Sequence, residues 1–403
     1  MKKKHLIIPA AVIGAISVIA LGIFLLLFII PQKIVVQPTV FDVGGDNYTI
    51  IFQTSLKGSG YVKYTVDGEE KIVWDTTSGS ISTHDDIHSI SVPKNELRNN
   101  TYVVGSQFVA YKLGYSAIKG RSVESDPISF RGEEKEDNIN ILAITDVHNK
   151  QKEMMEAASF FTQEFDMVVM LGDIVSDFGN KSRFTDHVLT DAATLSKGEI
   201  PVVYARGNHE TRGEYASQML KYFRTESGEL YYTFKFGALS AIVLDTGEDK
   251  EDSHKEYSGL VDFASYREKQ YSWIESLDAE DFDGRYKIVF SHMPSIDDHF
   301  GKNWMTPLKN LGAQLIVGGH HHRSEIFEKE ILAFDACGKY SEGWAASSLT
   351  LTNDLIMMKT INTEGEVLLD KYLNVWEANH RDEATESPTE ENSSEAQTEA
   401  LAE

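Results

Sequence analysis

Five stretches of the second half of this chain end an apolar run on side chains that can bind a metal ion. They are ILAIT before Asp146 and His148, MVVML before Asp173, PVVYA before Asn208 and His209, KIVF before His292, and QLIV before His320, His321 and His322. The clusters supply aspartate, asparagine and histidine, and this mixture of oxygen and nitrogen donors suits Zn, Fe or Mn better than Ca. A surface accident could explain three consecutive histidines alone, but it does not explain five such endings in one chain.

The apolar runs alternate with helical patterns, which predicts a layered α/β domain. In such folds the carboxyl ends of strands converge on one crevice, so the five clusters are expected to meet there. Residues 151–165 are expected to form a helix with one apolar face, Met154, Ala158, Phe161 and Phe165. Because successive side chains of an extended chain alternate, His320 and His322 should face one way and His321 the other.

The ordered motifs Asp-x-His, Gly-Asp, Gly-Asn-His-Glu, Ser-His-Met-Pro and Gly-His-x-His make residues 139–376 similar to the calcineurin-like metallophosphoesterase superfamily. The resemblance implies an α/β fold in which a two-sheet β-sandwich is flanked by helices, with two divalent transition metal ions (Mn, Fe or Zn). It implies that one ion is held by Asp146, His148 and His322 and the other by Asn208, His292 and His320. Asp173 would bridge the two ions.

The resemblance also implies an enzyme that hydrolyses phosphate mono- or diesters by attack of a metal-bridging hydroxide, without a protein nucleophile. His209 follows a ligand and is not needed as one, so it is the candidate general acid. A role as a hydrogen-bonding group at the rim stays open for it. Candidate substrate-binding residues are Arg206, Arg212, His299 and Trp304.

Residues 34–131 read as short strands separated by turn residues, which predicts an all-β sandwich, with residues 132–138 as a linker. This region resembles the fibronectin-like domain that precedes the catalytic domain of purple acid phosphatases. Those enzymes carry a tyrosinate three residues after the bridging aspartate and lack the histidine of Asp-x-His. Here Ser176 and His148 stand at these positions, so a committed ferric ion is not expected.

The two ends of the chain have different compositions. Residues 6–30 are uncharged and follow three lysines, which predicts a transmembrane signal anchor within residues 1–33, with a cleaved signal peptide as the alternative. The protein is therefore expected to be a single-pass protein of the cell membrane, with a cytoplasmic N-terminus and an extracellular catalytic domain. Residues 377–403 are rich in Glu, Ser and Thr, which predicts a disordered acidic tail.

Composition excludes some classes and leaves others open. A net charge of −24 argues against a nucleic-acid-binding surface, and the single Cys337 excludes an intrachain disulfide. The expected partners are a phosphate-ester substrate and, through the N-terminal helix, the membrane; the oligomeric state is open. The alternative is a non-catalytic cell-surface binding protein, an adhesin whose metal site is structural. Such a relative would be expected to lack a ligand or the general acid, and this chain has all of them.

Overall fold

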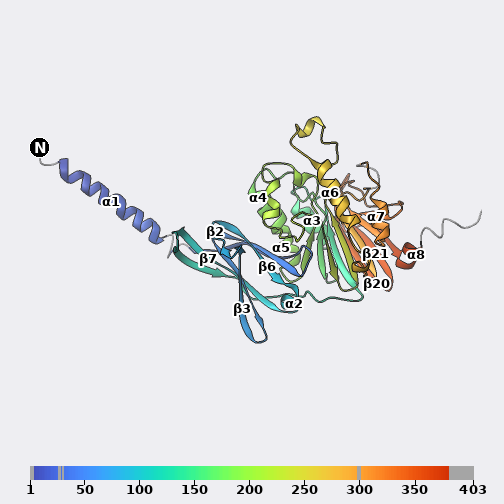
Figure 1. Ribbon diagram of the computed structural model, residues 1–403, viewed down its shortest axis with the longest axis horizontal. Helices are drawn as coiled ribbons and strands as arrows, with labels where there is room; N and C mark the ends of the chain where they lie inside the picture. The colour runs from blue at the N-terminus through green and yellow to red at the C-terminus, as the bar shows by residue number, and fades with distance from the viewer. Residues whose placement is uncertain (1–3, 26–28, 30, 297–300, 381–403) are drawn as a thin grey trace, which may run out of the picture.

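Two β-sheets packed face to face form the centre of the α/β part of the protein. The computed structural model describes residues 4–25, 29, 31–296 and 301–380 (Figure 1). The first sheet contains, in spatial order, β22 (Val367–Asn374), β21 (Leu355–Asn362), β20 (Gly343–Thr352), β10 (Ile139–Ile144), β11 (Met167–Met170) and β12 (Pro201–Tyr204), and β19 (Lys339–Tyr340) pairs with β20. The second contains β13 (Tyr232–Phe236), β14 (Leu239–Leu244), β15 (Tyr286–Ser291), β16 (Leu315–Gly318), β18 (Leu332–Asp335) and β17 (Glu325–Phe327).

Strands β10, β11 and β12 run parallel in the first sheet, as do β14, β15, β16 and β18 in the second. Their inner faces share one core, to which Ile141, Val169, Val243 and Phe290 contribute fully buried side chains. Strands covered on both faces need apolar residues at every position, which is why they stand out in the sequence as continuous apolar runs.

Helices cover the outer face of each sheet. The first sheet packs against α3 (Gln151–Ala158), the π-helical turn η2 (Phe184–Leu189), which follows α4 (Lys181–Arg183), and α5 (Thr190–Ser196). The second packs against α6 (Phe263–Glu275) and α7 (Met305–Asn310). The remaining helical segments are η3 (His209–Thr211), η4 (Ala216–Lys221), η5 (Lys255–Tyr257), η6 (Ala279–Asp281) and α8 (Val375–Asn379). The α/β sandwich flanked by helices is thus confirmed.

The helix predicted over residues 151–165 is shorter than expected. It ends at Ala158, where Ser159 donates its backbone N–H to the carbonyl of Glu156 in a tighter turn. Phe161 and Phe165 still pack against the core that α3 covers, although they lie beyond the helix. The apolar pattern therefore identified residues that pack against the core but overestimated the length of the helix.

The N-terminal part is rich in strands: β1 (Ile34–Asp42), β2 (Asn47–Val66), β3 (Glu69–Trp74), β4 (Thr76–Thr77), β5 (Ser80–Ile81), β6 (Asp85–Pro93), β7 (Thr101–Lys112), β8 (Ala117–Glu124) and β9 (Ile128–Ser129), with the short helix α2 (Lys94–Leu97). It has a core of its own, in which Tyr48, Phe52, Tyr102 and Phe130 are buried. The expected β-rich region preceding the α/β part is present.

The N-terminal strands are not separate from the α/β part, as an independent sandwich would be. Strand β1 pairs in parallel with β12, with Val40 opposite Pro201, so among the described residues both parts belong to one hydrogen-bonded sheet of 14 strands. Residues 47–66 also form one long strand, β2, instead of short strands separated by turn residues, with a register irregularity before Gly58. Local turn residues in the sequence could not reveal either pairing.

The helix α1 (Lys4–Phe24) extends away from the rest of the chain (Figure 1). In the part of the chain that the structure describes, no helix has both the length and the apolar character needed to cross a membrane. The transmembrane segment predicted from residues 6–30 is therefore not confirmed, and residues 26–28 and 30 of that run lie outside the described residues. The predicted extracellular location stays a prediction. The predicted acidic tail lies outside the described residues from 381 onward.

Candidate metal centre

The loops that follow β10, β11, β12, β15 and β16 bring the predicted ligands together. Among the described residues, three overlapping groups of side chains have donor atoms within 4.8 Å of one another. They are Asp146 with His148 and His322, His148 with Asp173 and His209, and Asp173 with His292 and His320. The strand ends of two different sheets therefore meet at one place, as their sequence pattern predicted.

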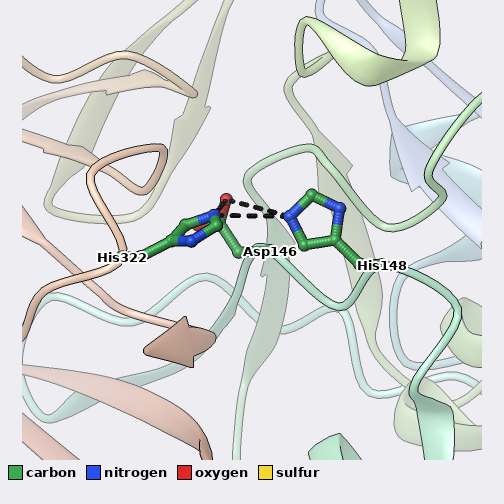
Figure 2. Close-up of side chains that lie close together, drawn as sticks. All are labelled: Asp146, His148 and His322. Atoms are coloured by element: carbon green, nitrogen blue, oxygen red, sulfur yellow. Dashed lines mark hydrogen bonds and ion pairs between the residues drawn. The ribbon is translucent and has the colours of Figure 1, made fainter. Parts of the chain in front are cut away.

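The first group surrounds one oxygen of Asp146. Figure 2 shows the imidazoles of His148 and His322 directed at that carboxylate from opposite sides. Nε2 of His322 lies 3.1 Å from Oδ1 of Asp146, and Nε2 of His148 lies 3.9 Å from the same oxygen. The two Nε2 atoms are 3.3 Å apart. Three donor atoms thus face a common point.

The second group is arranged around Asp173. Nε2 of His292 lies 3.3 Å from Oδ2 of Asp173 and 3.1 Å from Oδ1 of Asn208. Nδ1 of His292 is 2.7 Å from the carbonyl oxygen of Leu171. A carbonyl oxygen can only accept, so Nδ1 carries the hydrogen in this contact. This fixes the ring and turns Nε2 toward the site, as is usual for metal-binding histidines.

The ligand loops hold an unusual backbone conformation. Asp146, His148, Asp173, His320 and His322 all have a positive φ, between 48° and 71°. Such conformations cost residues other than glycine about 1 kcal/mol or more each and are concentrated at functional sites. The strand β16 ends at Gly318, before the histidines, so the left-handed backbone, not strand alternation, turns His320 and His322 toward the site.

Two glycines allow the loops to approach closely. A side chain at Gly207 would collide with the backbone nitrogen and Oδ1 of Asp173, at 2.3 Å and 2.2 Å. One at Gly319 would come within 2.3 Å of Oδ2 of Asp146. Any larger residue at either position would push a ligand loop away from its neighbour.

Glu210 ties two of these loops together. Its fully buried carboxylate accepts hydrogen bonds from the backbone N–H groups of Asp173, Ile174, Val175 and Gly207, at 2.7 Å to 3.2 Å. These contacts make Glu210 the brace between the Asp173 loop and the Asn208 loop.

The charges of the site are those of a cation-binding cluster. Burial by itself would raise the pKa of Asp173, but the neighbouring His292 holds that pKa below its usual range, so the carboxylate is ionised. Burial lowers the pKa of both His148 and His320 to about 4, which keeps these imidazoles neutral and able to donate a lone pair. At His292 the effect of burial is outweighed by Asp173 and Asp146, which raise its pKa to about 10.

These residues fit a metal ion. Oδ1 of Asp146 is buried, and within the described part of the chain it accepts no well-aligned hydrogen bond although two imidazole nitrogens face it. Leaving such an atom without a partner is costly, and a cation between it and the imidazoles would remove that cost. Asp173 and Asp146 also raise the pKa of His292, which shows that they stabilise a positive charge at this place. A bound metal ion would supply such a charge.

His209 lies beside the cluster. Its Nε2 is 3.8 Å from Oδ2 of Asp173, and its Nδ1 is 2.8 Å from the carbonyl oxygen of Ser176 and so carries a hydrogen. Nη1 of Arg212 lies 3.1 Å from the same Nε2. The same Nη1 also lies 3.3 Å from Nδ1, so the guanidinium faces both ring nitrogens and not the lone pair of Nε2 alone.

The predicted substrate-binding arginines have different environments. Arg206 is 13% exposed and its Nη2 is paired with Asp245 at 2.8 Å, which favours a structural role, while a substrate contact stays a prediction. Arg212 is about one-third exposed, and Nε and Nη2 are held by Glu248 at 2.7 Å and 2.8 Å. Its Nη1 is left on the side of His209.

Sequence reasoning missed Asp245 and Glu248. Both follow β14, an apolar strand that ends on Asp245, Thr246 and Gly247, the same pattern that identified the other five strand ends. Glu248 is buried and also accepts a hydrogen bond from Tyr257 at 3.2 Å, so Arg212 is held by a rigid partner. A search for carboxylates as well as metal ligands after each strand would have found them.

The remaining predicted residues are two substrate contacts, Trp304 and His299, and the middle histidine, His321. Trp304 is 1% exposed and packs beneath α6, edge-on to Tyr271, so the expectation of a substrate contact is wrong for it. His299 lies outside the described residues. His321 faces away from the cluster, as expected: its Nε2 is 2.8 Å from Oγ of Ser295, and its ring packs edge-on to Phe327.

Comparison with known proteins agrees with this site. Residues 139–324 match the family model described as calcineurin-like phosphoesterase, and this range includes the loops that follow all five strands. This part of the chain is therefore similar to calcineurin-like phosphoesterases. All seven predicted metal ligands lie within the matched residues.

Among the proteins similar to the chain are one curated relative and two solved structures. "Serine/threonine-protein phosphatase CPPED1" of Danio rerio is 23% identical over 191 residues, 43% of this chain and 59% of that protein. A purple acid phosphatase, PPD1 of yellow lupin (Lupinus luteus), has a TM-score of 0.54 and 11% identity, covering 84% of this chain and 74% of its own. A structure of PhoD covers 84% and 88% at 12% identity, with a TM-score of 0.47. The lupin enzyme supports the fold over both the N-terminal strands and the α/β part.

Proposed function

We propose that the protein is a metal-dependent hydrolase of phosphate mono- or diesters. The observation that carries the proposal is the overlap of the three donor groups, which share His148 and Asp173. Overlapping groups suit two ions held side by side, whereas a single structural ion would need only one group. Asp146, His148 and His322 would hold one ion, Asn208, His292 and His320 the other, and Asp173 both.

The chain supplies positions and charges for this reaction. Two divalent transition metal ions, when bound, would activate a water for in-line attack and neutralise charge on the phosphate. Glu210 keeps the loops of Asp173 and Asn208 at a fixed separation. Glu248 holds Arg212 so that Nη1 is presented at the rim of the site, where a phosphate oxygen could replace His209 as its partner.

We further propose that His209 gives a proton to the departing alkoxide. Its Nδ1 is held by the carbonyl of Ser176, so Nε2 is the atom that can reach a leaving group. A protonated His209 would face the positive guanidinium of Arg212, whose Nη1 lies 3.1 Å from Nε2. A phosphate that draws Arg212 to itself would relieve this repulsion, which links binding of the substrate to proton donation.

A panel of substrates tests the proposal. The full-length protein, purified and supplied in turn with Mn, Zn or Fe(II), should hydrolyse p-nitrophenyl phosphate or its bis-ester, and a chelator should abolish the activity. Comparison of the two esters decides between mono- and diesterase. A protein that binds metal but hydrolyses neither these esters nor a set of nucleotides and sugar phosphates would instead be a metal-stabilised binding protein.

A further inference from the structure

The turn between β7 and β8 exposes an unusual group of apolar side chains. Tyr111, Leu113, Tyr115 and Ile118 have exposed fractions of 61%, 47%, 110% and 44%. Single exposed apolar residues are common on protein surfaces and need no explanation. A group of them at one hairpin end, with two tyrosines among them, is typical of a surface that contacts a partner. We refer to residues 111–121 as the hairpin tip.

The charge of the hairpin tip is opposite to that of the protein. It contains Lys112, Lys119 and Arg121 and no acidic residue, in a chain of net charge −24. All three basic side chains are exposed, and Lys57 is exposed on the neighbouring stretch of β2, where Gly58 pairs with Phe108 of β7. A partner of the hairpin tip is therefore expected to be anionic.

The hairpin tip lies where the apolar helix α1 joins the strands. Gln32 donates hydrogen bonds to the carbonyl oxygen of Leu56 and to Oγ of Ser106, each at 3.2 Å, and so fixes the start of β1 against β2 and β7. Figure 1 shows the end of the β7 hairpin beside the end of α1. On α1 the side chains of Ile16 and Ile19 are exposed. Apolar surface of the helix and of the hairpin tip thus lies at the same end of the protein.

We propose that the hairpin tip docks on the surface of an anionic lipid bilayer. Tyrosine side chains have an apolar ring and a polar hydroxyl, which suits them to the boundary between lipid headgroups and acyl chains. Lysine and arginine beside them would meet the lipid phosphates, and each basic residue near an anionic surface strengthens this attraction. This contact does not require that any helix cross the bilayer, and it does not depend on the phosphoesterase activity.

The test places an environment-sensitive fluorophore on the hairpin tip of the full chain. The native Cys337 is 1% exposed, so a cysteine introduced by Leu113→Cys can be labelled selectively. The same label at Glu70→Cys, at the exposed β2–β3 turn that points away from α1 in Figure 1, is the control position. Vesicles are made of phosphatidylcholine alone or mixed with anionic phosphatidylglycerol.

The proposal predicts a blue-shifted emission at position 113, and quenching by a lipid-borne quencher, with the anionic vesicles but not with the neutral ones. Position 70 should remain in water with both. Lys112→Glu with Lys119→Glu should reduce the lipid-bound fraction at 113 by roughly fivefold or more for each reversal. The matched pair Lys152→Glu with Lys371→Glu, which makes the same change in net charge at exposed sites elsewhere, should leave it unchanged.

Three results would overturn the proposal. Position 113 could stay in water with anionic vesicles, or the matched control pair could reduce its lipid contact as much as the hairpin pair. A blue shift that needs no vesicles and grows with protein concentration would show that the hairpin tip instead contacts a second copy of this chain.

Discussion

Nη1 of Arg212 lies 3.1 Å from Nε2 of His209, the atom from which the proposed proton transfer would start. Glu248 holds the other side of the guanidinium at 2.8 Å, so Arg212 cannot move far without losing a buried partner. The two residues therefore form a unit in which, under the proposed mechanism, Arg212 would bind phosphate and His209 would serve the leaving group. Separate substitutions should divide these two roles.

His209→Ala should lower kcat by on the order of 10²-fold or more for an alkyl phosphate ester, and distinctly less for p-nitrophenyl phosphate. Nitrophenolate leaves without a proton donor, whereas an alkoxide does not. Metal content should be unchanged. Steady-state kinetics on the two esters make the measurement, and equal losses on both would mean that His209 acts on the phosphate and not on the leaving group.

Arg212→Lys should raise KM for both esters by similar factors, because an ammonium cannot keep the paired contact with Glu248 while reaching a phosphate oxygen. The variant should show no preference between leaving groups, in contrast to His209→Ala. Arg206→Lys is the matched control at the arginine paired with Asp245. It should affect stability more than KM, and a larger rise of KM for Arg206→Lys would reverse these assignments.

The three consecutive histidines give an internal control. His320→Ala and His322→Ala each remove a proposed ligand, so each should reduce metal content and activity strongly. His321→Ala removes only the contacts with Ser295 and Phe327 and should retain metal and most activity. Metal analysis of the three variants under the same conditions makes the comparison, and loss of metal in the His321 variant would require a different ligand set.

The N-terminal strands contact the α/β part through Asp85. Its carboxylate accepts hydrogen bonds from Lys181, Lys221 and Tyr222, all on the α/β part. Burial opposes ionisation of Asp85, but Lys221 and Lys181 hold its pKa below the usual range. Its contribution to stability is therefore present above the unfolded-state pKa, near 4, and is lost as the pH falls through the lower folded-state value.

Asp85→Asn should accordingly lower the free energy of unfolding by about 1–3 kcal/mol at pH 7. The difference from the unchanged protein should shrink as the pH is lowered below about 4. Chemical denaturation at a series of pH values measures this difference in the free energy of unfolding. Asp126→Asn, at an exposed site in the N-terminal part, is the control. An unchanged stability at pH 7 would mean that the contacts between the two parts are weak.

Asp191 is predicted to have the opposite pH dependence. Burial raises its pKa to about 8, so in the folded protein it holds a proton that the unfolded chain releases near pH 4. Stability should therefore fall as the pH rises from about 4 to 8. Asp191→Asn removes this dependence and should raise the melting temperature at pH 8 more than at pH 5. Asp186→Asn, an exposed neighbour, should do neither.

The sequence predicted the strand ends and their ligands because both are local signals. A buried parallel strand must be apolar throughout, and a ligand directly after it needs no partner from elsewhere to be recognised. Asp146, Asp173 and His292 were identified in this way. The left-handed backbone at the ligands, by contrast, follows from the packing of loops such as Gly207 against Asp173 and has no local pattern of its own.

The contacts that the sequence did not predict are those between distant segments. Arg206 and Arg212 looked alike beside Asn208, and only the fold distinguishes them, because Asp245 covers one and Glu248 holds the other by one edge. The pairing of β1 with β12 was missed for the same reason. Trp304 lies in a polar stretch of sequence, yet α6 covers it.

The metal content of the purified protein and of its Asp173→Asn variant is the measurement that bears most directly on the phosphoesterase proposal. Elemental analysis of the unchanged protein should give about two transition metal ions per chain, and removal of the ions by a chelator should remove ester hydrolysis, which Mn, Zn or Fe(II) then restores. Asp173→Asn should lose metal and activity together, because one carboxylate would serve both ions. A chain that holds two ions and normal turnover after Asp173→Asn, or one that hydrolyses esters at full rate without metal, would contradict the account.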